Sequence, residues 1–276
     1  AVHAPPVRIT TTQHTKDTIR MPSLKDTIIL ITGASSGIGE ASARLFAREG
    51  CALILAARRM DRISALAGEL RTAHGIRTLT MELDVRSRNA VEAAIAELPD
   101  EWADIDILVN NAGLSRGMSK LHEAQVEDWE EMIDTNVKGL LYVSRAVVPG
   151  MAARKRGHVI NISSIAAHQT YPGGNVYCGS KAAVRAITEG LRMDLLGTGV
   201  RVCAISPGMV ETEFSMVRYH GDEQRAAKTY ENMKPLTAND IAEIVLFAAM
   251  RPAHVDLPEI IVMPVDQASV YHVHRG

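Results

Sequence analysis

Short apolar runs alternate with stretches of helical spacing from residue 27 onward. Seven runs predict buried strands because their apolar residues are continuous, which is typical of strands covered on both faces. These runs lie at residues 27–31, 52–56, 78–83, 107–109, 158–162, 200–205 and 259–263. Such alternation predicts βαβ units with right-handed crossovers. We therefore expect an α/β fold: a single doubly wound domain with about seven parallel strands and helices on both faces of the sheet.

The two ends of the chain differ from this pattern. Residues 1–26 are rich in Thr and Pro and lack the apolar core of a secretory signal. We expect a flexible arm or an appended sequence there, in preference to an organelle transit peptide, and Met21 could be a natural start. The expected catalytic domain covers 27–265, and residues 266–276 form a tail. His272 and His274 in that tail fit surface or subunit contacts better than a metal site.

Composition excludes several classes of protein. The chain has 30 Lys+Arg against 32 Asp+Glu, a formal net charge of −2, so it lacks the basic field of a nucleic-acid binder. No window approaches the length of apolar sequence that a membrane span needs. The three cysteines form an odd set without C-x-x-C spacing, which argues against a disulfide framework or a zinc site. We expect a cytoplasmic protein with no nucleic-acid, membrane or metal partner.

A glycine-rich loop joins the first strand to the first helix. It reads T-G-A-S-S-G-I-G at residues 32–39, and its spacing is G-x-x-x-G-x-G rather than the common G-x-G-x-x-G. Glycines at such a turn let backbone N–H groups approach a phosphate, and the helix N-terminus adds a positive dipole. Its place directly after the first strand predicts a nucleotide cofactor.

The second strand ends in two arginines, Arg58 and Arg59, where many dinucleotide folds place an acid for the ribose. A carboxylate there accepts a hydrogen bond from a ribose 2′-hydroxyl, whereas an arginine favours a 2′-phosphate. The alternative is a solvated charge pair that opens the next helix. With the acid absent, the sequence predicts NADP rather than NAD.

Seven motifs, in order, resemble those of short-chain dehydrogenases/reductases over residues 27 to about 265. They are T-G-A-S-S-G-I-G (32–39), D-V (84–85), N-N-A-G (110–113), N-V-K-G (136–139), N-I-S-S (161–164), Y-C-G-S-K (177–181) and S-P-G-M-V-E-T (206–212). The resemblance implies a Rossmann-type sheet and a nicotinamide cofactor, with the adenine at 84–85 and the nicotinamide at 207–208. The expected cofactor-binding residues are Gly33, Ser35, Ser36, Gly37, Ile38, Gly39, Arg58, Arg59, Asp84, Val85, Asn110, Ala112, Gly113, Tyr177, Lys181, Pro207, Gly208, Val210 and Thr212.

The resemblance also implies a catalytic set, and residue chemistry supports part of it. Tyr177 and Lys181 are four residues apart and share a helix face. An ammonium about 4 Å from a phenol contributes roughly 4 kcal/mol at a dielectric near 20, which lowers the phenol pKa by about three units. Tyr177 would then act as a general acid/base near neutral pH. Ser164 would bind the substrate oxygen, with Ser163 as the adjacent alternative, and Asn136 would hold a proton-relaying water.

Longer strings are similar to the NADP-dependent 3-hydroxy acid dehydrogenases, a subgroup that includes serine 3-dehydrogenases and malonic semialdehyde reductases. They include V-E-D-W-E-E-M-I-D-T-N-V-K-G-L and T-E-F-S-M-V-R-Y-H-G-D. The sequence departs from the subgroup pattern at residues 115–116 and 168–170. A short acid needs a cation for its carboxylate. The candidates are Arg218, in an expected lid at about 209–234, and Arg116, and His168 is a further candidate substrate residue.

The expected reaction is hydride transfer between NADP(H) and a short 3-hydroxy acid or the matching aldehyde or ketone. A same-family reductase of another carbonyl (sulfoacetaldehyde, sugar, acyl thioester or steroid) is the alternative, and a non-catalytic nucleotide sensor is a third. The family resemblance further implies a homo-oligomer, a dimer or tetramer, formed through helices at 124–150 and 176–196.

Overall fold

The computed structural model describes residues 23–276, so most of the expected N-terminal arm, including Met21, lies outside the described residues. The seven predicted strands form one parallel sheet in the order β3-β2-β1-β4-β5-β6-β9, which confirms the expected fold class. Each strand begins and ends within two residues of its prediction. The strands are β1 (Ile28–Thr32), β2 (Ala52–Ala57), β3 (Thr78–Glu82), β4 (Ile107–Asn110), β5 (Gly157–Ile162), β6 (Val200–Pro207) and β9 (Glu259–Val262).

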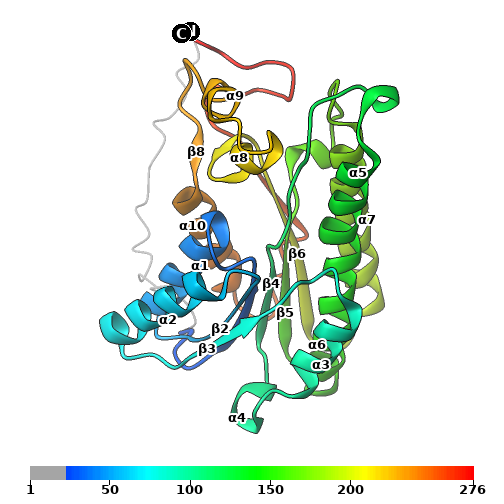
Figure 1. The fold of residues 1–276 in the computed structure, drawn as a ribbon. Helices are drawn as coiled ribbons and strands as arrows, with labels where there is room; N and C mark the ends of the chain where they lie inside the picture. The colour runs from blue at the N-terminus through cyan, green and yellow to red at the C-terminus, as the bar shows by residue number, and fades with distance from the viewer. Residues whose placement is uncertain (1–22) are drawn as a thin grey trace, which may run out of the picture.

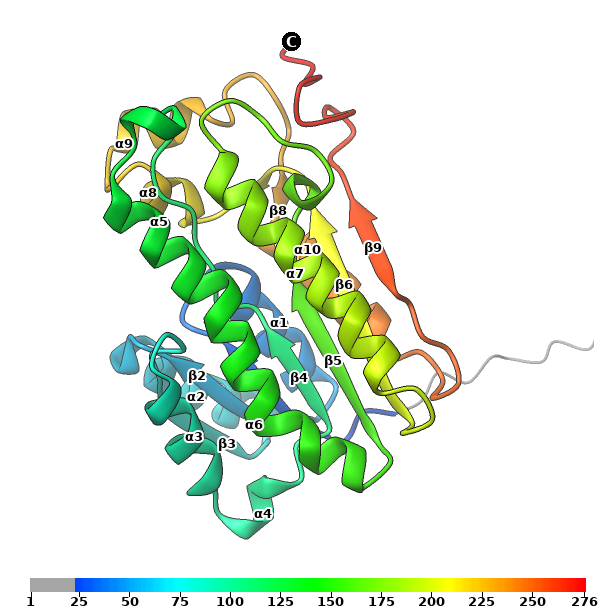
Figure 2. The same ribbon diagram turned by 90° about the vertical axis from the view of Figure 1, so that its right-hand side faces the viewer.

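Helices cover both faces of this sheet, as Figures 1 and 2 show. In β1, Ile29 and Ile31 belong to one apolar core and Leu30 to the other, and all three are fully buried. This is why the strand sequence is continuously apolar. One face packs α1 (Gly37–Arg48), α2 (Met60–His74) and α10 (Ala238–Ala249); the other packs α3 (Arg88–Ala96), α6 (Leu140–Ala153) and α7 (Asn175–Asp194).

The long helical stretch expected at 124–150 is interrupted by a wider turn. Helix α5 (Val126–Ile133) passes into a π-helical turn, η2 (Asp134–Gly139), and then into α6. Such π turns in α-helices are frequent at functional sites. Three further short helical segments connect elements: α4 (Asp100–Ala103), η1 (Leu121–Glu123) and η3 (Ile165–Ala167).

The expected lid is largely helical. It contains β7 (Val210–Glu211), α8 (Phe214–Arg218) and α9 (Glu223–Lys228), and β7 pairs with β8 (Leu236–Thr237) in a small second sheet. Figure 1 shows α8 and α9 beyond the carboxyl ends of the main strands.

Both ends of the described chain pack more closely on the domain than the sequence suggests. Leu24 is only 7% exposed, and its carbonyl accepts a hydrogen bond from the Cys51 thiol. At the other end, Gln267 forms an antiparallel bridge with Val273, and Arg275 donates to the Thr229 carbonyl at 3.0 Å. The tail therefore crosses the lid. No helix within residues 23–276 is long and apolar enough to cross a membrane.

Candidate active site

A cavity of about 500 Å³ lies at the carboxyl ends of the strands, where ligands of open α/β sheets bind. Residues from the loops after β1, β2, β3, β4, β5 and β6 line it, together with the lid and the C-terminal tail. All expected cofactor residues except Gly39 and Asn110 line this cavity. The structure thus brings the separate sequence motifs together in one place.

The glycine loop has the backbone that a phosphate-binding turn requires. Gly33 has φ +65°, in the left-handed region that favours glycine. Gly39 lies beneath the turn, where a Cβ atom would approach the Gly33 carbonyl oxygen to 2.4 Å. Gly39 thus shapes the loop without lining the cavity, and the start of α1 at Gly37 is left open to a phosphate.

The two arginines after β2 lie at the cavity wall and already have partners. Arg59 donates to the Ser35 and Ser36 hydroxyls at 3.1 and 2.7 Å and forms an ion pair with Glu213 at 2.9 Å. Glu213 also pairs with Arg62 at 2.6 Å. Arg58 is 4.0 Å from a carboxylate oxygen of Glu131. Neither Glu213 nor Glu131 could be recognised as a partner beforehand, because both acids lie far from the arginines along the chain.

The structure corrects the expected role of Asn110. Its side-chain amide donates to the Ser144 hydroxyl at 3.0 Å and to the Asn161 amide oxygen at 2.9 Å, inside the protein and away from the cavity. The next residue, Asn111, lines the cavity instead and donates to the Thr32 carbonyl at 3.0 Å. Side chains alternate at the end of a strand, so only one of the two asparagines can face the site.

Asn136 lies in the π-helical turn and supports the site from behind. Its amide oxygen accepts from Leu114 N, and its amide nitrogen donates to Leu114 O, both at 2.8 Å. The same nitrogen is 3.0 Å from the Ser180 hydroxyl. Asn136 does not line the cavity but fixes the loop after β4. The expected hold of Asn136 on a relay water stays a prediction.

Ser164, Tyr177 and Lys181 come together at the inner wall of the cavity. Ser164 lies beside the Tyr177 phenol and lowers its pKa, whereas the Ser163 hydroxyl donates to the Lys181 carbonyl at 3.4 Å. Of the two serines, the structure therefore places Ser164 against the phenol. Lys181 Nζ donates to the Ile162 carbonyl at 2.9 Å and lies 6.0 Å from the centroid of the Tyr177 ring.

The acidity of these groups differs from the sequence expectation. Burial raises the pKa of Tyr177 above its usual value, and Arg218 and the Ser164 hydrogen bond oppose this rise. Burial also lowers the pKa of Lys181 to about 8. The expected shift toward neutral pH is thus wrong for the protein alone. A solvated ammonium about 4 Å away would lower the phenol pKa, but Tyr177 and Lys181 are both desolvated, which disfavours their charged forms.

Arg218 enters the cavity from the end of α8. Its guanidinium carbon is 5.3 Å from the Tyr177 ring centroid and 4.9 Å from that of Phe214, and one Nη donates to the Tyr171 hydroxyl at 3.1 Å. Its Nε atom is buried and has no hydrogen-bond partner within residues 23–276. A buried guanidinium N–H without an acceptor is costly unless a ligand satisfies it.

The other two candidate substrate residues are not in this cavity. Arg116 pairs with Glu131 at 2.6 Å and donates to the Val217 carbonyl at 2.7 Å. His168 Nε2 lies 2.6 Å from Glu259, which also accepts from the Ser206 hydroxyl. Neither side chain lines the cavity. Arg116 follows N-N-A-G and His168 follows N-I-S-S closely in sequence, but their side chains contact Glu131 and Glu259 instead of the cavity.

Gln267 is a cavity residue that sequence reasoning missed. It is 5% exposed, and its amide oxygen accepts from Met209 N at 2.8 Å beside the expected nicotinamide position. It belongs to the tail, whose sequence carries no recognisable signal for the site.

All three cysteines are buried and free, and burial raises the pKa of the Cys51 and Cys203 thiols to about 12. Within residues 23–276, no group of three or more His, Cys, Asp or Glu side chains could hold a metal.

Residues 27–223 match the model of the short chain dehydrogenase family, and the chain belongs to this family. It is 52% identical, over 90% of its length and 100% of the relative's, to the NADP-dependent 3-hydroxy acid dehydrogenase YdfG of Salmonella typhi. It is 46% identical to the serine 3-dehydrogenase of Agrobacterium fabrum, over 90% and 98%. Among solved structures, the closed form of serine dehydrogenase complexed with NADP+ has a TM-score of 0.85 and 49% identity, over 91% and 100% of the two chains.

Proposed function

We propose that the protein transfers a hydride between NADP(H) and a short 3-hydroxy acid, such as serine, allo-threonine or 3-hydroxypropionate, or the corresponding carbonyl compound. The observation that carries this proposal is the position of the Arg218 guanidinium, which enters the cavity beside Tyr177. Its Nε atom is buried and finds no hydrogen-bond acceptor among the described residues. An arginine in this position suits a carboxylate, which accepts two N–H groups at once. The names of the relatives, 3-hydroxy acid and serine dehydrogenases, agree with such a substrate.

The enzyme is an NADP-dependent oxidoreductase that acts on CH–OH groups. The described residues fit this cofactor: the Gly33 turn offers backbone N–H groups to the pyrophosphate, and Arg58 and Arg59 line the cavity where a 2′-phosphate would lie. When bound, NADP(H) supplies the nicotinamide C4 that accepts or donates the hydride. The protein's own task is to bind the substrate, orient it and move one proton.

Tyr177 is the group that we assign to the proton. In the reduction direction, its hydroxyl donates a proton to the developing alkoxide, and a raised pKa keeps it protonated at neutral pH. In the oxidation direction, the phenolate accepts the alcohol proton. Ser164 lines the cavity beside Tyr177 and would share the substrate oxygen, and Lys181 Nζ lies 6.0 Å from the centroid of the phenol ring. A hydrogen bond to the reacting oxygen stabilises the charge that develops on it.

The position of Arg218 relative to Tyr177 favours short substrates. In a 3-hydroxy acid a single carbon separates the carbinol carbon from the carboxylate. The two groups that would hold these ends are also close, with 5.3 Å between the guanidinium carbon and the phenol ring centroid. A carboxylate on Arg218 would therefore orient the carbinol toward Tyr177 and the nicotinamide side of the cavity.

Replacing Arg218 tests this proposal. We expect Arg218→Ala to raise the KM for 3-hydroxypropionate about 10- to 100-fold, because a charge-assisted contact worth about 1.5–3 kcal/mol is lost. The KM for 1,3-propanediol, which has no carboxylate, should stay within about twofold. Steady-state assays that follow NADPH absorbance measure both constants.

Arg225→Ala is the matched control, because Arg225 is also a lid arginine over a tyrosine ring, at 4.7 Å from Tyr219, but lies outside the cavity. An Arg218→Ala enzyme with an unchanged KM for hydroxy acids would contradict the carboxylate assignment. Assays with sulfoacetaldehyde, a sugar alcohol and a steroid distinguish the alternative substrates, since faster turnover of one of these would overturn the choice of 3-hydroxy acids.

A further inference from the structure

The short lid helix α8 needs support from outside, because five residues cannot hold a stable helix alone. Its last carbonyl groups carry the negative end of its dipole, and those of Met216 and Val217 accept from backbone N–H groups of the turn that follows. The segment after N-N-A-G meets this end. Arg116 donates to the Val217 carbonyl at 2.7 Å, and Gly117 N donates to the Arg218 carbonyl at 2.9 Å. Both contacts hold the backbone that carries Arg218.

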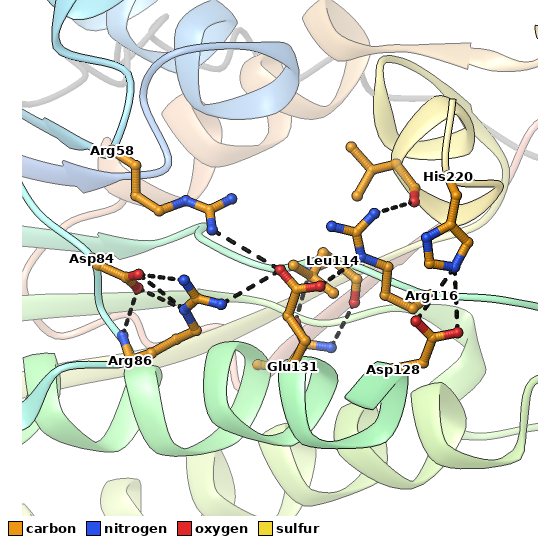
Figure 3. Close-up of polar contacts among 10 residues, drawn as sticks. Arg58, Asp84, Arg86, Leu114, Arg116, Asp128, Glu131 and His220 are labelled. Atoms are coloured by element: carbon orange, nitrogen blue, oxygen red, sulfur yellow. Dashed lines mark hydrogen bonds and ion pairs between the residues drawn. The ribbon is translucent and has the colours of Figure 1, made fainter. Parts of the chain in front are cut away.

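Arg116 is itself fixed by Glu131 of α5, as Figure 3 shows. Its Nε donates to one Glu131 oxygen at 2.6 Å, and both side chains are 21% exposed. The other oxygen of Glu131 faces Arg86 at 3.5 Å and Arg58 at 4.0 Å. The hydrogen bond from Arg116 is the main cause that lowers the pKa of Glu131. The carboxylate is therefore ionised at neutral pH and holds the guanidinium in one orientation.

A second contact joins the lid to the same helix: His220 Nε2 lies 3.3 Å from Asp128, also drawn in Figure 3. His220 is exposed, so this contact contributes little. Arg116 is the only one of these side chains that joins a partly buried acid to a lid carbonyl among the described residues. Its planar fork makes the two contacts in different directions, which an ammonium cannot reproduce.

We propose that Arg116, held by Glu131, is a positioning residue that docks the end of α8 and so sets Arg218 against the substrate carboxylate. This inference deepens the proposed function, since it rests on Arg218 as the carboxylate ligand. Arg116 touches neither substrate nor cofactor in this arrangement. It determines how selectively the enzyme binds acids by fixing the lid backbone.

The test is a double-mutant cycle on the full chain. We expect Arg116→Ala and Arg116→Lys to raise the KM for 3-hydroxypropionate about 5- to 50-fold, with the KM values for NADP and 1,3-propanediol within about twofold. In an Arg218→Ala background, Arg116→Ala should add no further increase, because it acts through the same residue. Glu131→Gln should change the KM for the acid in the same direction, since it keeps the side-chain shape but removes the charge.

Amide hydrogen exchange gives a readout that does not depend on turnover. We expect faster exchange at residues 215–221 in Arg116→Ala, with no change at β4 or β5. Arg88→Ala is the matched control, because Arg88 pairs with Glu92 on an exposed surface at 2.8 Å. Unchanged exchange of α8, or an Arg116 effect that adds fully to that of Arg218→Ala, would overturn the positioning role. If Arg218→Ala alone leaves the KM unchanged, the proposed function fails instead.

Discussion

His158 lies in strand β5 of the central sheet and is 3% exposed. Neither ring nitrogen has a hydrogen-bond partner among the described residues. Burial, with the nearby Arg201 as a second cause, lowers the pKa of His158 from 6.5 to about 3. The folded protein thus keeps this imidazole neutral where the unfolded chain would protonate it.

This difference predicts an acid-dependent loss of stability. Between pH 6.5 and about 3 the unfolded state binds one more proton, so the free energy of unfolding falls as pH decreases. The loss approaches about 1.4 kcal/mol per pH unit for a single site. We expect His158→Leu to remove this contribution and to reduce the slope between pH 6 and 4. Urea denaturation across this range measures it.

His74→Leu serves as the control for this experiment, since His74 is an exposed residue at the end of α2. In the His74→Leu protein, the free energy of unfolding should depend on pH as it does in the wild-type protein. A His158→Leu protein with the wild-type slope would show that other buried groups cause the acid sensitivity.

At the scale of single residues, sequence motifs located the site but not its electrostatics. Ser164, Tyr177 and Lys181 line one cavity as the motif order predicted. Their pKa values depend on how deeply they are buried, which no spacing along the chain reports. The partners of Arg59 and Arg116 were equally hidden, because Glu213 and Glu131 approach them only after folding.

At the scale of elements, α8 is held at both ends by arginines. Arg116 contacts its last turn, and Arg59 and Arg62 pair with Glu213, the residue that precedes its first turn. The Glu213 carboxylate therefore occupies the neighbourhood of the arginines that a 2′-phosphate would use. Two anions that share the same cations weaken each other's binding.

We therefore predict that Glu213→Gln tightens NADP binding. Its Kd should fall about two- to fivefold at low salt, in line with the small energy of exposed ion pairs. The Kd for NAD, which has no 2′-phosphate, should not change. Titration of protein fluorescence measures both values, and Glu211→Gln, an exposed lid acid, is the control. Weaker NADP binding in Glu213→Gln would mean instead that this acid orients Arg59.

Elements with strong periodicity were predictable, and those shaped by tertiary contacts were not. The seven strands were found within two residues because each contains a short apolar run, and β1, β2 and β4 are buried along their whole length. The π-helical turn at Asp134–Gly139 leaves no mark on the spacing of apolar residues. Helices α8 and α9 are too short to show a period, so the lid was expected only as a long, mixed segment.

At the scale of the whole molecule, the C-terminal tail completes the cavity. Gln267 connects the tail to the cavity, because its side-chain oxygen accepts a hydrogen bond from Met209 N. The same oxygen lies against Gly208, where an added Cβ atom would approach it to 2.4 Å. The expected division into a domain and a separate tail at residue 266 thus runs through the site. The expected homo-oligomer stays a prediction, supported by exposed apolar side chains on the helices concerned, among them Leu141 and Met193.

Gln267→Leu tests the contribution of the tail. Loss of the acceptor leaves the half-buried Met209 N without its partner, which costs about 1 kcal/mol of stability. We expect a lower thermal midpoint and a KM for NADP that rises several-fold, because the turn at 207–209 loses its support. Gln224→Leu on the exposed surface of α9 is the control. A normal KM for NADP would show that the turn holds its shape without the tail.

The position of Gln267 also has a consequence for synthesis on the ribosome. The cavity wall is built from residues between Gly33 and Val270, so every residue in this range must leave the exit tunnel before the wall can close. The glycine loop and β2 are made early, but a nascent chain that stops before residue 267 lacks the support of the turn at Pro207–Gly208. The cavity can therefore take its final form only after residue 267 has left the exit tunnel.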